Sequence, residues 1–195
     1  MIGRTFAHYL AVLAGRALPR TQTTPAERDL LAQLLPGRRH VVEIGVFEGF
    51  TTRILAERSD PAAKVYGVDP FFTGRLGVSW GLEIASAYNR RHLASGKLRL
   101  VRTLSTTVGH EVPKTVDYVF IDGDHSLAGI AADWAFWSNR LAPAGIIALH
   151  DTLLVPGRAK AAELGSHQYF RSHIRHDARF EIIAQQDSLA VLRKL

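Results

Sequence analysis

The sequence predicts an α/β fold in which a parallel sheet carries helices on both faces and ends in an antiparallel hairpin. Apolar runs alternate with helical patterns from residue 40 onward. These runs are too continuously apolar for strands that face water on one side, which is typical of a parallel sheet buried between helices. The last two runs are separated by the polar stretch Gln185-Gln186-Asp187-Ser188, a spacing that favours a hairpin.

The expected elements follow in order along the chain. A helix begins near Thr24, where a hydroxyl cap precedes Pro25 and Glu27, and it ends at Pro36-Gly37. Ile130, Trp134, Trp137 and Leu141 share one face of a later helix, which predicts that both tryptophans lie in the core. Strands are expected over residues 40–46, 64–69, 98–104, 116–122, 145–150, 180–184 and 189–192, and helices over 51–58, 82–93, 126–141 and 159–174.

Length and composition indicate one globular domain. The chain has 195 residues, of which 47% are hydrophobic, so it can bury a substantial core without covalent staples. It contains no cysteine, which excludes disulfides, thiolate zinc sites, iron–sulfur clusters and a cysteine nucleophile. We expect a helical appendage over residues 1–25, a domain over residues 26–195, and a cytoplasmic location.

The N-terminal segment is apolar over residues 6–14 but is shorter than the roughly 20 residues that a membrane-spanning helix needs. It also lacks the full pattern of a signal peptide. We expect an amphipathic helix that packs on its own domain. The alternatives are a cover over a substrate cleft, a contact between subunits of a homo-oligomer, and a membrane surface.

The net charge of +6 raises the question of nucleic-acid binding. The basic residues are scattered in short groups such as Arg38-Arg39, Arg90-Arg91 and Arg193-Lys194, with no long basic run. Solvated basic faces together with a basic anion pocket explain the balance as well as nucleic acid does. Composition therefore leaves nucleic acid open as a partner.

Two motifs at strand ends suit a ligand that contains a ribose and a positive charge. Ligands of open parallel sheets bind at the carboxyl ends of the strands. Glu43, Gly45 and Gly49 follow the first strand, and their spacing departs from the G-x-G-x-x-G of dinucleotide sites because Phe47 replaces the middle glycine. Glu43 suits a cationic group, while Asp69 at the end of the second strand suits the two hydroxyls of a ribose.

Two further motifs concentrate titratable groups at neighbouring strand ends. Asp122 and His125 follow the fourth strand, and His150 and Asp151 follow the fifth. This set is enough for either a divalent metal site or an acid–base pair. Asp124 or Ser126 is expected to cap the helix that follows.

Taken in order, these motifs resemble the class I S-adenosylmethionine-dependent methyltransferases. The segments that carry the resemblance lie between Val41 and Thr152 and read VVEIGVFEG, VYGVDP, VDYVFIDGDHS and LAPAGIIALHDT. They look most like the branch that includes macrolide sugar O-methyltransferases and cephalosporin-hydroxylase-like proteins. The resemblance implies a Rossmann-like methyltransferase fold with a seven-stranded sheet, and the terminal hairpin fits its final antiparallel strand.

The resemblance also implies S-adenosylmethionine (SAM) as the cofactor and assigns the residues around it. Three would shape the methionine pocket, one would hold the ribose, and three would line the adenine. By position these are Glu43, Gly45 and Gly49 for methionine, Asp69 for the ribose, and Pro70, Phe71 and Ser105 for the adenine, with Asp122 also counted as cofactor-binding.

Metal-dependent members of the family hold magnesium with a D-x-x-H pair and a later Glu-Asp pair. The first pair corresponds to Asp122 and His125, while the second has become His150-Asp151. An imidazole ligand disfavours magnesium relative to manganese, iron or zinc. A divalent metal, magnesium or manganese, held by Asp122, His150 and Asp151 is therefore an open expectation.

The function expected from these residues is O-methylation of a small hydroxylated acceptor, such as a sugar or a natural product. His125 is the candidate base, with Asp122 as its catalytic partner, because imidazole titrates near neutral pH. The alternatives are methylation of RNA or another nucleic acid, and a binding protein without turnover on the same fold. A nicotinamide-dependent oxidoreductase is disfavoured by the missing middle glycine.

Acceptor specificity is expected in three segments, which are the N-terminal helix, residues 72–81 and residues 153–176. Their basic and aromatic side chains would suit an acidic or phosphorylated acceptor, although solvated loop charge explains them as well. These side chains are Arg75, Trp80, Arg158, Lys160, His167, Arg171, His173, Arg175 and His176.

Overall fold

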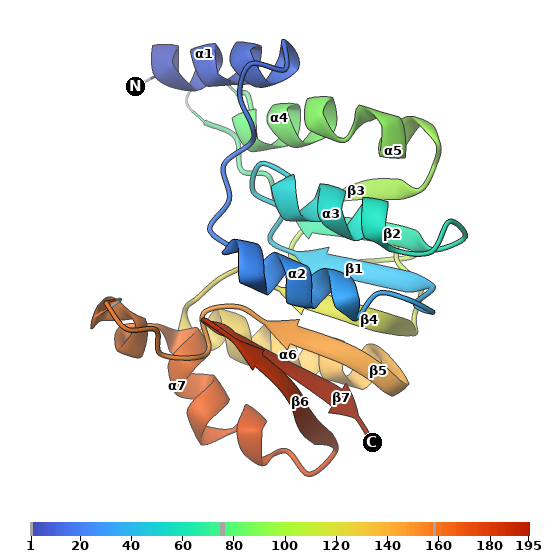
Figure 1. Cartoon of the computed structure of the whole chain (residues 1–195), viewed down its shortest axis with the longest axis vertical. Coiled ribbons are helices and arrows are strands. Elements are labelled where there is room, and N and C mark those ends of the chain that lie inside the picture. Colours follow the sequence, from blue (N-terminus) through green and yellow to red (C-terminus); the bar gives the residue numbers. More distant parts are fainter. Residues whose placement is uncertain (1, 75–76, 158) are drawn as a thin grey trace.

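The computed structural model, which describes residues 2–74, 77–157 and 159–195, has a seven-stranded sheet with the order β3-β2-β1-β4-β5-β7-β6 (Figure 1). The first five strands of this order run parallel, and β7 pairs antiparallel with both β5 and β6. The predicted fold class is confirmed, including the C-terminal antiparallel hairpin.

The strands and helices keep close to the expected order. The strands are β1 (His40–Ile44), β2 (Lys64–Asp69), β3 (Leu98–Arg102), β4 (Val116–Ile121), β5 (Leu141–Leu149), β6 (Phe180–Gln186) and β7 (Leu189–Lys194). The α-helices are α1 (Ile2–Leu13), α2 (Pro25–Gln33), α3 (Phe50–Arg58), α4 (Trp80–Tyr88), α5 (Arg90–Ala94), α6 (Leu127–Arg140) and α7 (Gly165–Ser172). The 3₁₀ turns are η1 (Ser105–Thr107), η2 (Ala159–Glu163) and η3 (Ile174–His176).

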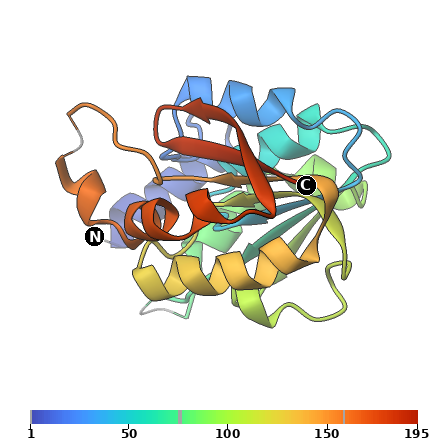
Figure 2. The same cartoon turned by 90° about the horizontal axis from the view of Figure 1, so that it is seen from below.

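The sheet separates two apolar layers, because successive side chains of a strand point to opposite faces. Val41 packs with Leu31 of α2 and Leu55 of α3 on one face. Val42 belongs to the cluster on the other face, which contains Trp134 of α6. Figure 2 shows α2 and α3 on one side of the sheet and α6 on the other. Trp134 and Trp137 lie in the core, as predicted.

The helix predicted over residues 82–93 is divided by Asn89. The side chain of Asn89 is fully buried, and its amide nitrogen donates to the carbonyls of Gly49 (2.9 Å) and Ala85 (3.0 Å). These bonds hold the turn that leads into α3 against the end of α4. The apolar periodicity of the sequence continues across Asn89 and gives no sign of the break. The break is caused by the contact of Asn89 with the distant Gly49.

The expected long helix over residues 159–174 is shorter in the structure, where α7 begins at Gly165. A side chain at this position would meet the backbone nitrogen of Leu127 at 2.0 Å, so the start of α7 packs directly on the start of α6. Strand β5 begins earlier than expected, at Leu141, and the β4–β5 register shifts near Ala144, whose φ is 57°. The chain leaves β3 at Arg102 instead of residue 104.

Helix α1 packs on α4, as expected of a helix that covers its own domain (Figure 1). The Trp80 ring lies 5.6 Å from the Phe6 ring and 5.7 Å from the Tyr9 ring. Among the described residues, no helix combines the length and the apolar character needed to cross a bilayer. The domain boundary at residue 25 and the cytoplasmic location stay predictions.

Candidate functional site

A cavity of about 640 Å³ lies at the carboxyl ends of β1, β2 and β4, where the sequence predicted ligand binding. The predicted residues that line it are Glu43, Gly45, Asp69, Pro70, Ser105, Asp122 and His125. Phe72 comes from the predicted acceptor segment, and the residues that line the cavity without having been predicted include Arg20, Thr21, Gln22, Phe47, Phe50, Leu104, Thr106 and Asp133.

Gly45 and Gly49 shape the turn between β1 and α3 in different ways. Gly45 has a φ of 85°, and a Cβ there would lie 2.1 Å from the carbonyl oxygen of Asp122. Only glycine lets the ends of β1 and β4 approach so closely. Gly49 precedes α3 with a φ of 78° and is packed against Asn89 and Ala85. It supports the turn but does not line the cavity.

Asp69 fixes the loop that borders the cavity. One carboxylate oxygen accepts from the backbone N–H groups of Val46 (3.0 Å) and Phe47 (3.2 Å), and the other accepts from Phe71 (2.6 Å). Phe71 itself is buried with Val46 beneath the loop, so it does not line the cavity. The exposed ring of Phe72 does.

Glu43 lies beneath the cavity in a fully buried position on β1. Burial raises the pKa of its carboxyl well above the usual range, against the effect of a hydrogen bond from the hydroxyl of Thr52, and the nearby Asp122 and Asp69 raise it further. A positively charged ligand group would lower this pKa again, because an opposite charge favours the ionised form. Glu43 therefore favours a cationic ligand.

Asp133 is a buried acid in the cavity wall that lies outside the sequence motifs. It lies on α6, is 3% exposed, and accepts a hydrogen bond from the hydroxyl of Ser105. Burial raises the pKa of Asp133 to about 6. The available signal was its position on the same helical face as Ile130, Trp134 and Trp137, where an acid must have a polar partner.

The segment between α1 and α2 also borders the cavity, which the sequence did not predict. The buried carboxylate of Glu48 accepts from the backbone N–H of Arg20 (2.5 Å) and contacts the ring of His8 (2.9 Å). These contacts hold Arg20, Thr21 and Gln22 at the cavity. The turn between β1 and α3 therefore anchors the N-terminal segment through the carboxylate of Glu48.

His125 lies between two cavities. It lines the cavity described above and also a second one of about 590 Å³ that includes Glu163 and Gln168. Its Nε2 atom is 3.8 Å from Asp122 Oδ1 and 3.9 Å from Asp151 Oδ2, and its side chain is 31% exposed. At these distances two carboxylates lie near the ring without a fixed hydrogen bond to it.

Ser126 caps α6, as expected for one of the two candidates. Its side chain accepts from the backbone N–H of Gly129 at 3.0 Å. Asp124 contributes by accepting from both the N–H and the hydroxyl of Ser126, each at 2.9 Å. The loop that carries His125 is therefore fixed on its helix side.

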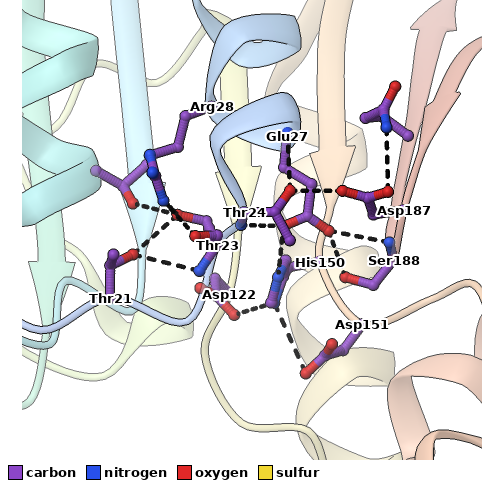
Figure 3. Close-up of polar contacts among 12 residues, drawn as sticks. Thr21, Thr23, Thr24, Glu27, Arg28, Asp122, His150, Asp151, Asp187 and Ser188 are labelled. Atoms are coloured by element: carbon purple, nitrogen blue, oxygen red, sulfur yellow. Dashed lines mark hydrogen bonds and ion pairs between the residues drawn. The ribbon is translucent and has the colours of Figure 1, made fainter. Parts of the chain in front are cut away.

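His150 has a fully buried ring among three carboxylates (Figure 3). Its Nδ1 atom is 2.9 Å from Asp122 Oδ1 and 3.7 Å from Asp151 Oδ2, and its Nε2 atom is 3.3 Å from Glu27 Oε2. The N–H directions are off these lines, so the contacts are ion pairs and not aligned hydrogen bonds. Burial alone would lower the pKa of His150, but Asp122, Glu27 and Asp151 raise it to about 10.

The predicted metal ligands do not fit a metal ion in this arrangement. The ring of His150 is fully buried, with Nε2 3.3 Å from Glu27 and Nδ1 2.9 Å from Asp122, so neither nitrogen is open to a metal ion. Throughout residues 2–74, 77–157 and 159–195, no group of three or more His, Cys, Asp or Glu side chains is arranged to hold a metal. Asp122 and Asp151 approach His125 instead.

The predicted acceptor residues are distributed among several structural roles. Trp80 packs on α1, and His167 Nδ1 lies 2.8 Å from the carbonyl oxygen of Thr152. The ring of His173 stacks on Tyr169 with the centroids 4.5 Å apart. Arg75 and Arg158 lie outside the described residues, as does the side chain of Lys160.

Comparison with known proteins identifies the family. Residues 42–152, more than half of the chain, match the family model described as a methyltransferase domain. This chain is a methyltransferase-domain protein. The matched residues begin in β1 and end just after β5, so they contain every strand end that lines the cavity.

The methyltransferase domain also has a curated relative and structural neighbours. The uncharacterized protein y4gI of Sinorhizobium fredii is 26% identical over 120 residues, a stretch that covers 58% of this chain and 13% of that protein. The chain thus spans only a small part of this relative's length.

Three solved structures are similar in fold. An O-methyltransferase from Bacillus cereus, in complex with S-adenosylhomocysteine (SAH), is 18% identical, with a TM-score of 0.68 and coverage of 98% of this chain and 91% of that one. The O-methyltransferase TomG of Streptomyces achromogenes, involved in tomaymycin synthesis and solved with SAM, is 16% identical (TM-score 0.69; coverage 97% and 89%). An rRNA methylase from Streptococcus thermophilus is 20% identical (TM-score 0.59; coverage 90% and 99%). At these identities the similarity is one of fold.

Proposed function

We propose that this methyltransferase uses SAM to methylate a hydroxyl group of a small acceptor. The observation that carries the proposal is the cavity in which Asp69 and Glu43 lie at neighbouring strand ends, with Gly45 in the same lining. An acid after β2 suits a ribose, and a buried acid on β1 suits the cationic methionine end. The complexes of two structural neighbours with SAH and SAM support the same ligand.

In this proposal the adenosyl part lies over β2 and α6. Asp69 keeps its three bonds to the loop and accepts from one ribose hydroxyl at the acceptor site that remains on Oδ1. The adenine lies toward Pro70, Ser105 and Asp133, where the acid and the hydroxyl form one polar pair. The methionine ammonium group approaches Glu43, which places the sulfonium near the end of β4 and its Asp122.

The transfer needs a deprotonated acceptor oxygen in line with the sulfonium methyl group. The oxygen forms a bond to the methyl carbon as the carbon–sulfur bond breaks, and the bonding electrons leave with sulfur as the neutral thioether of SAH. The hydroxyl proton passes to the imidazole of His125, and Asp122 and Asp151 stabilise the resulting cation. Most of the rate gain comes from alignment and charge complementarity. No step is assigned to a metal, because the predicted ligands do not fit one.

The acceptor in this proposal enters beside His125, which faces both cavities. The side chain of Arg20 is 57% exposed at the cavity and pairs with Glu48 Oε1 at 3.6 Å through one guanidinium nitrogen, so its remaining N–H groups can contact an acidic or phosphorylated acceptor. Because Arg20 lies at the cavity, we include an anionic group on the acceptor in the proposal.

Two measurements test the proposed function. Calorimetric titration of the protein should show binding of SAM and SAH, and tighter binding of NAD would overturn the assignment. With methyl-labelled SAM and a panel of hydroxylated acceptors, His125→Ala should keep cofactor affinity and lower turnover by about 10² to 10⁴. Equal turnover in this variant would remove His125 from the mechanism.

Methylation of a nucleic acid is the second candidate, because the net charge of +6 is compatible with phosphate contacts. The test is a mobility-shift titration with RNA at several salt concentrations, because phosphate contacts weaken steeply as salt rises. Absence of binding at low salt ends this alternative. If SAM binds but no acceptor class is methylated, a binding protein without turnover is the better description.

A further inference from the structure

Glu27 forms a buried connection between the start of α2, the β6–β7 turn and His150 (Figure 3). Its carboxylate is 1% exposed. One oxygen accepts from the backbone N–H of Thr24 (2.7 Å), and the other accepts from the N–H (2.9 Å) and the hydroxyl (2.6 Å) of Ser188. Three bonds from two separate segments therefore fix this carboxylate in one position.

An ionised carboxylate such as Glu27 needs a positive partner when it is buried, because an unpaired charge is costly away from water. Within the described part of the chain, the ion pair that Glu27 makes is with Nε2 of His150, at 3.3 Å. The other side of the same ring faces Asp122 and Asp151, at 2.9 and 3.7 Å from Nδ1. His150 is thus enclosed by three carboxylates, of which Asp122 lines the cavity.

This arrangement places an organic cation at the strand end where the sequence led us to expect a metal ligand. The ring has no exposed surface, so it cannot contact the acceptor. The side chains of Asp122 and Asp151 are 17% and 11% exposed, and they lie 3.8 and 3.9 Å from His125 Nε2. His150 therefore faces both carboxylates from the interior, while Asp122 also lines the cavity.

We propose that Glu27 is a positioning residue that holds His150 against Asp122 and Asp151, and that this internal cation takes the place of a divalent ion, so that the site binds no catalytic metal. The proposal rests on the proposed function, because it concerns how the base His125 and its carboxylates are arranged for methyl transfer. A divalent ion could neutralise both carboxylates and bind the acceptor, whereas His150 can only do the first. Acceptor activation is then left to His125.

The first experiment titrates Mn²⁺ into the full chain, freed of metal and saturated with SAH, and follows free Mn²⁺ by electron paramagnetic resonance. We expect no stoichiometric Mn²⁺ binding by the wild-type protein. One tightly bound Mn²⁺ would overturn the proposal. The SAH titration in the same sample separates the two claims, since failure of SAH to bind contradicts the proposed function and not the absence of a metal.

A gain-of-binding variant tests whether His150 occupies a cation's place. The double variant Glu27→Gln/His150→Asp supplies a third carboxylate and removes the acid that would otherwise face it. It should bind one equivalent of Mn²⁺ and still bind SAH. The matched control Glu27→Gln/His150→Asn removes the same ion pair without adding a carboxylate and should bind none. If the first variant binds SAH but not Mn²⁺, the claim that His150 occupies the place of a metal ion is contradicted.

The role of Glu27 is tested in single variants by nitrogen NMR of the His150 ring, which needs no acceptor. In Glu27→Gln the ring should lose its proton at a lower pH than in the wild type. Thr24→Ala is the matched control, because it removes the hydroxyl cap of the same helix and leaves the Glu27 carboxylate in place. Equal ring titration in Glu27→Gln and the wild type would refute the positioning role, even if both variants lose stability.

Discussion

Gly45 offers a quantitative test of how closely β1 and β4 approach at the site. In Gly45→Ala the new Cβ would lie 2.1 Å from the carbonyl oxygen of Asp122, whereas such contacts essentially never fall below 3.0 Å. The two strand ends must therefore separate by about 1 Å, a displacement large enough to disturb catalysis. The residue that follows Asp122 belongs to the loop that carries His125.

The expected cost has two parts. An alanine at a φ of 85° pays about 1–2 kcal/mol for a left-handed conformation. Forcing the backbones apart adds about 1–3 kcal/mol, as overpacking does elsewhere. Gly37→Ala is the matched control, because Gly37 has a φ of 79° but no atom within 4 Å of its missing Cβ. Gly37→Ala should lower the free energy of unfolding by only about 1–2 kcal/mol.

The assay is urea denaturation followed by tryptophan fluorescence, with SAH affinity measured on the folded proteins. The free energy of unfolding should fall further in Gly45→Ala than in Gly37→Ala, by about 1–3 kcal/mol. SAH should bind more weakly to Gly45→Ala alone. Equal destabilisation and equal affinity in the two variants would refute the close approach of Gly45 to Asp122.

Three further predictions concern charged groups. Asp69→Asn should weaken SAH binding about 10- to 100-fold in calorimetry, because each lost hydrogen bond to the carboxylate costs about 1.5–3 kcal/mol; unchanged affinity would contradict ribose binding. SAH affinity should rise as the pH increases through about 6, because Asp133 beside the proposed adenine position ionises in this range. Asp133→Asn should remove that part of the rise. Pairing holds the pKa of Glu27 down at about 2 and that of His150 up at about 10, so the pair's stabilisation should be complete between pH 4.5 and 6.5. It should decline as pH rises through 10 or falls toward 2, which urea denaturation across pH should show for the wild type but not for Glu27→Gln/His150→Asn.

The succession of strands along the chain and the acids at their ends could be predicted from sequence because both depend on local patterns. A buried parallel strand has a continuous apolar run, and the polar residue that follows it must lie at the edge of the sheet. This logic located Glu43, Asp69 and Asp122 at one cavity. Thr24 was recognisable as a helix cap for the same reason, since capping depends on residues within one turn.

The parts that escaped prediction depend on contacts between distant segments. Glu27 has the sequence context of an ordinary first-turn acid, and nothing near it indicates that its carboxylate meets His150, 123 positions later. The break at Asn89 likewise depends on the carbonyl of Gly49. Asp133 was hidden by the tryptophans around it, which define an apolar face on which one acid is easily overlooked.

The most direct test of the account is a crystal structure of this methyltransferase domain with SAH. The proposed function predicts SAH in the cavity of about 640 Å³, with a ribose hydroxyl on Asp69, its amino group toward Glu43, and its adenine beside Ser105 and Asp133. SAH bound elsewhere, or a ribose that does not contact Asp69, would contradict the central claim that these strand ends form the cofactor site.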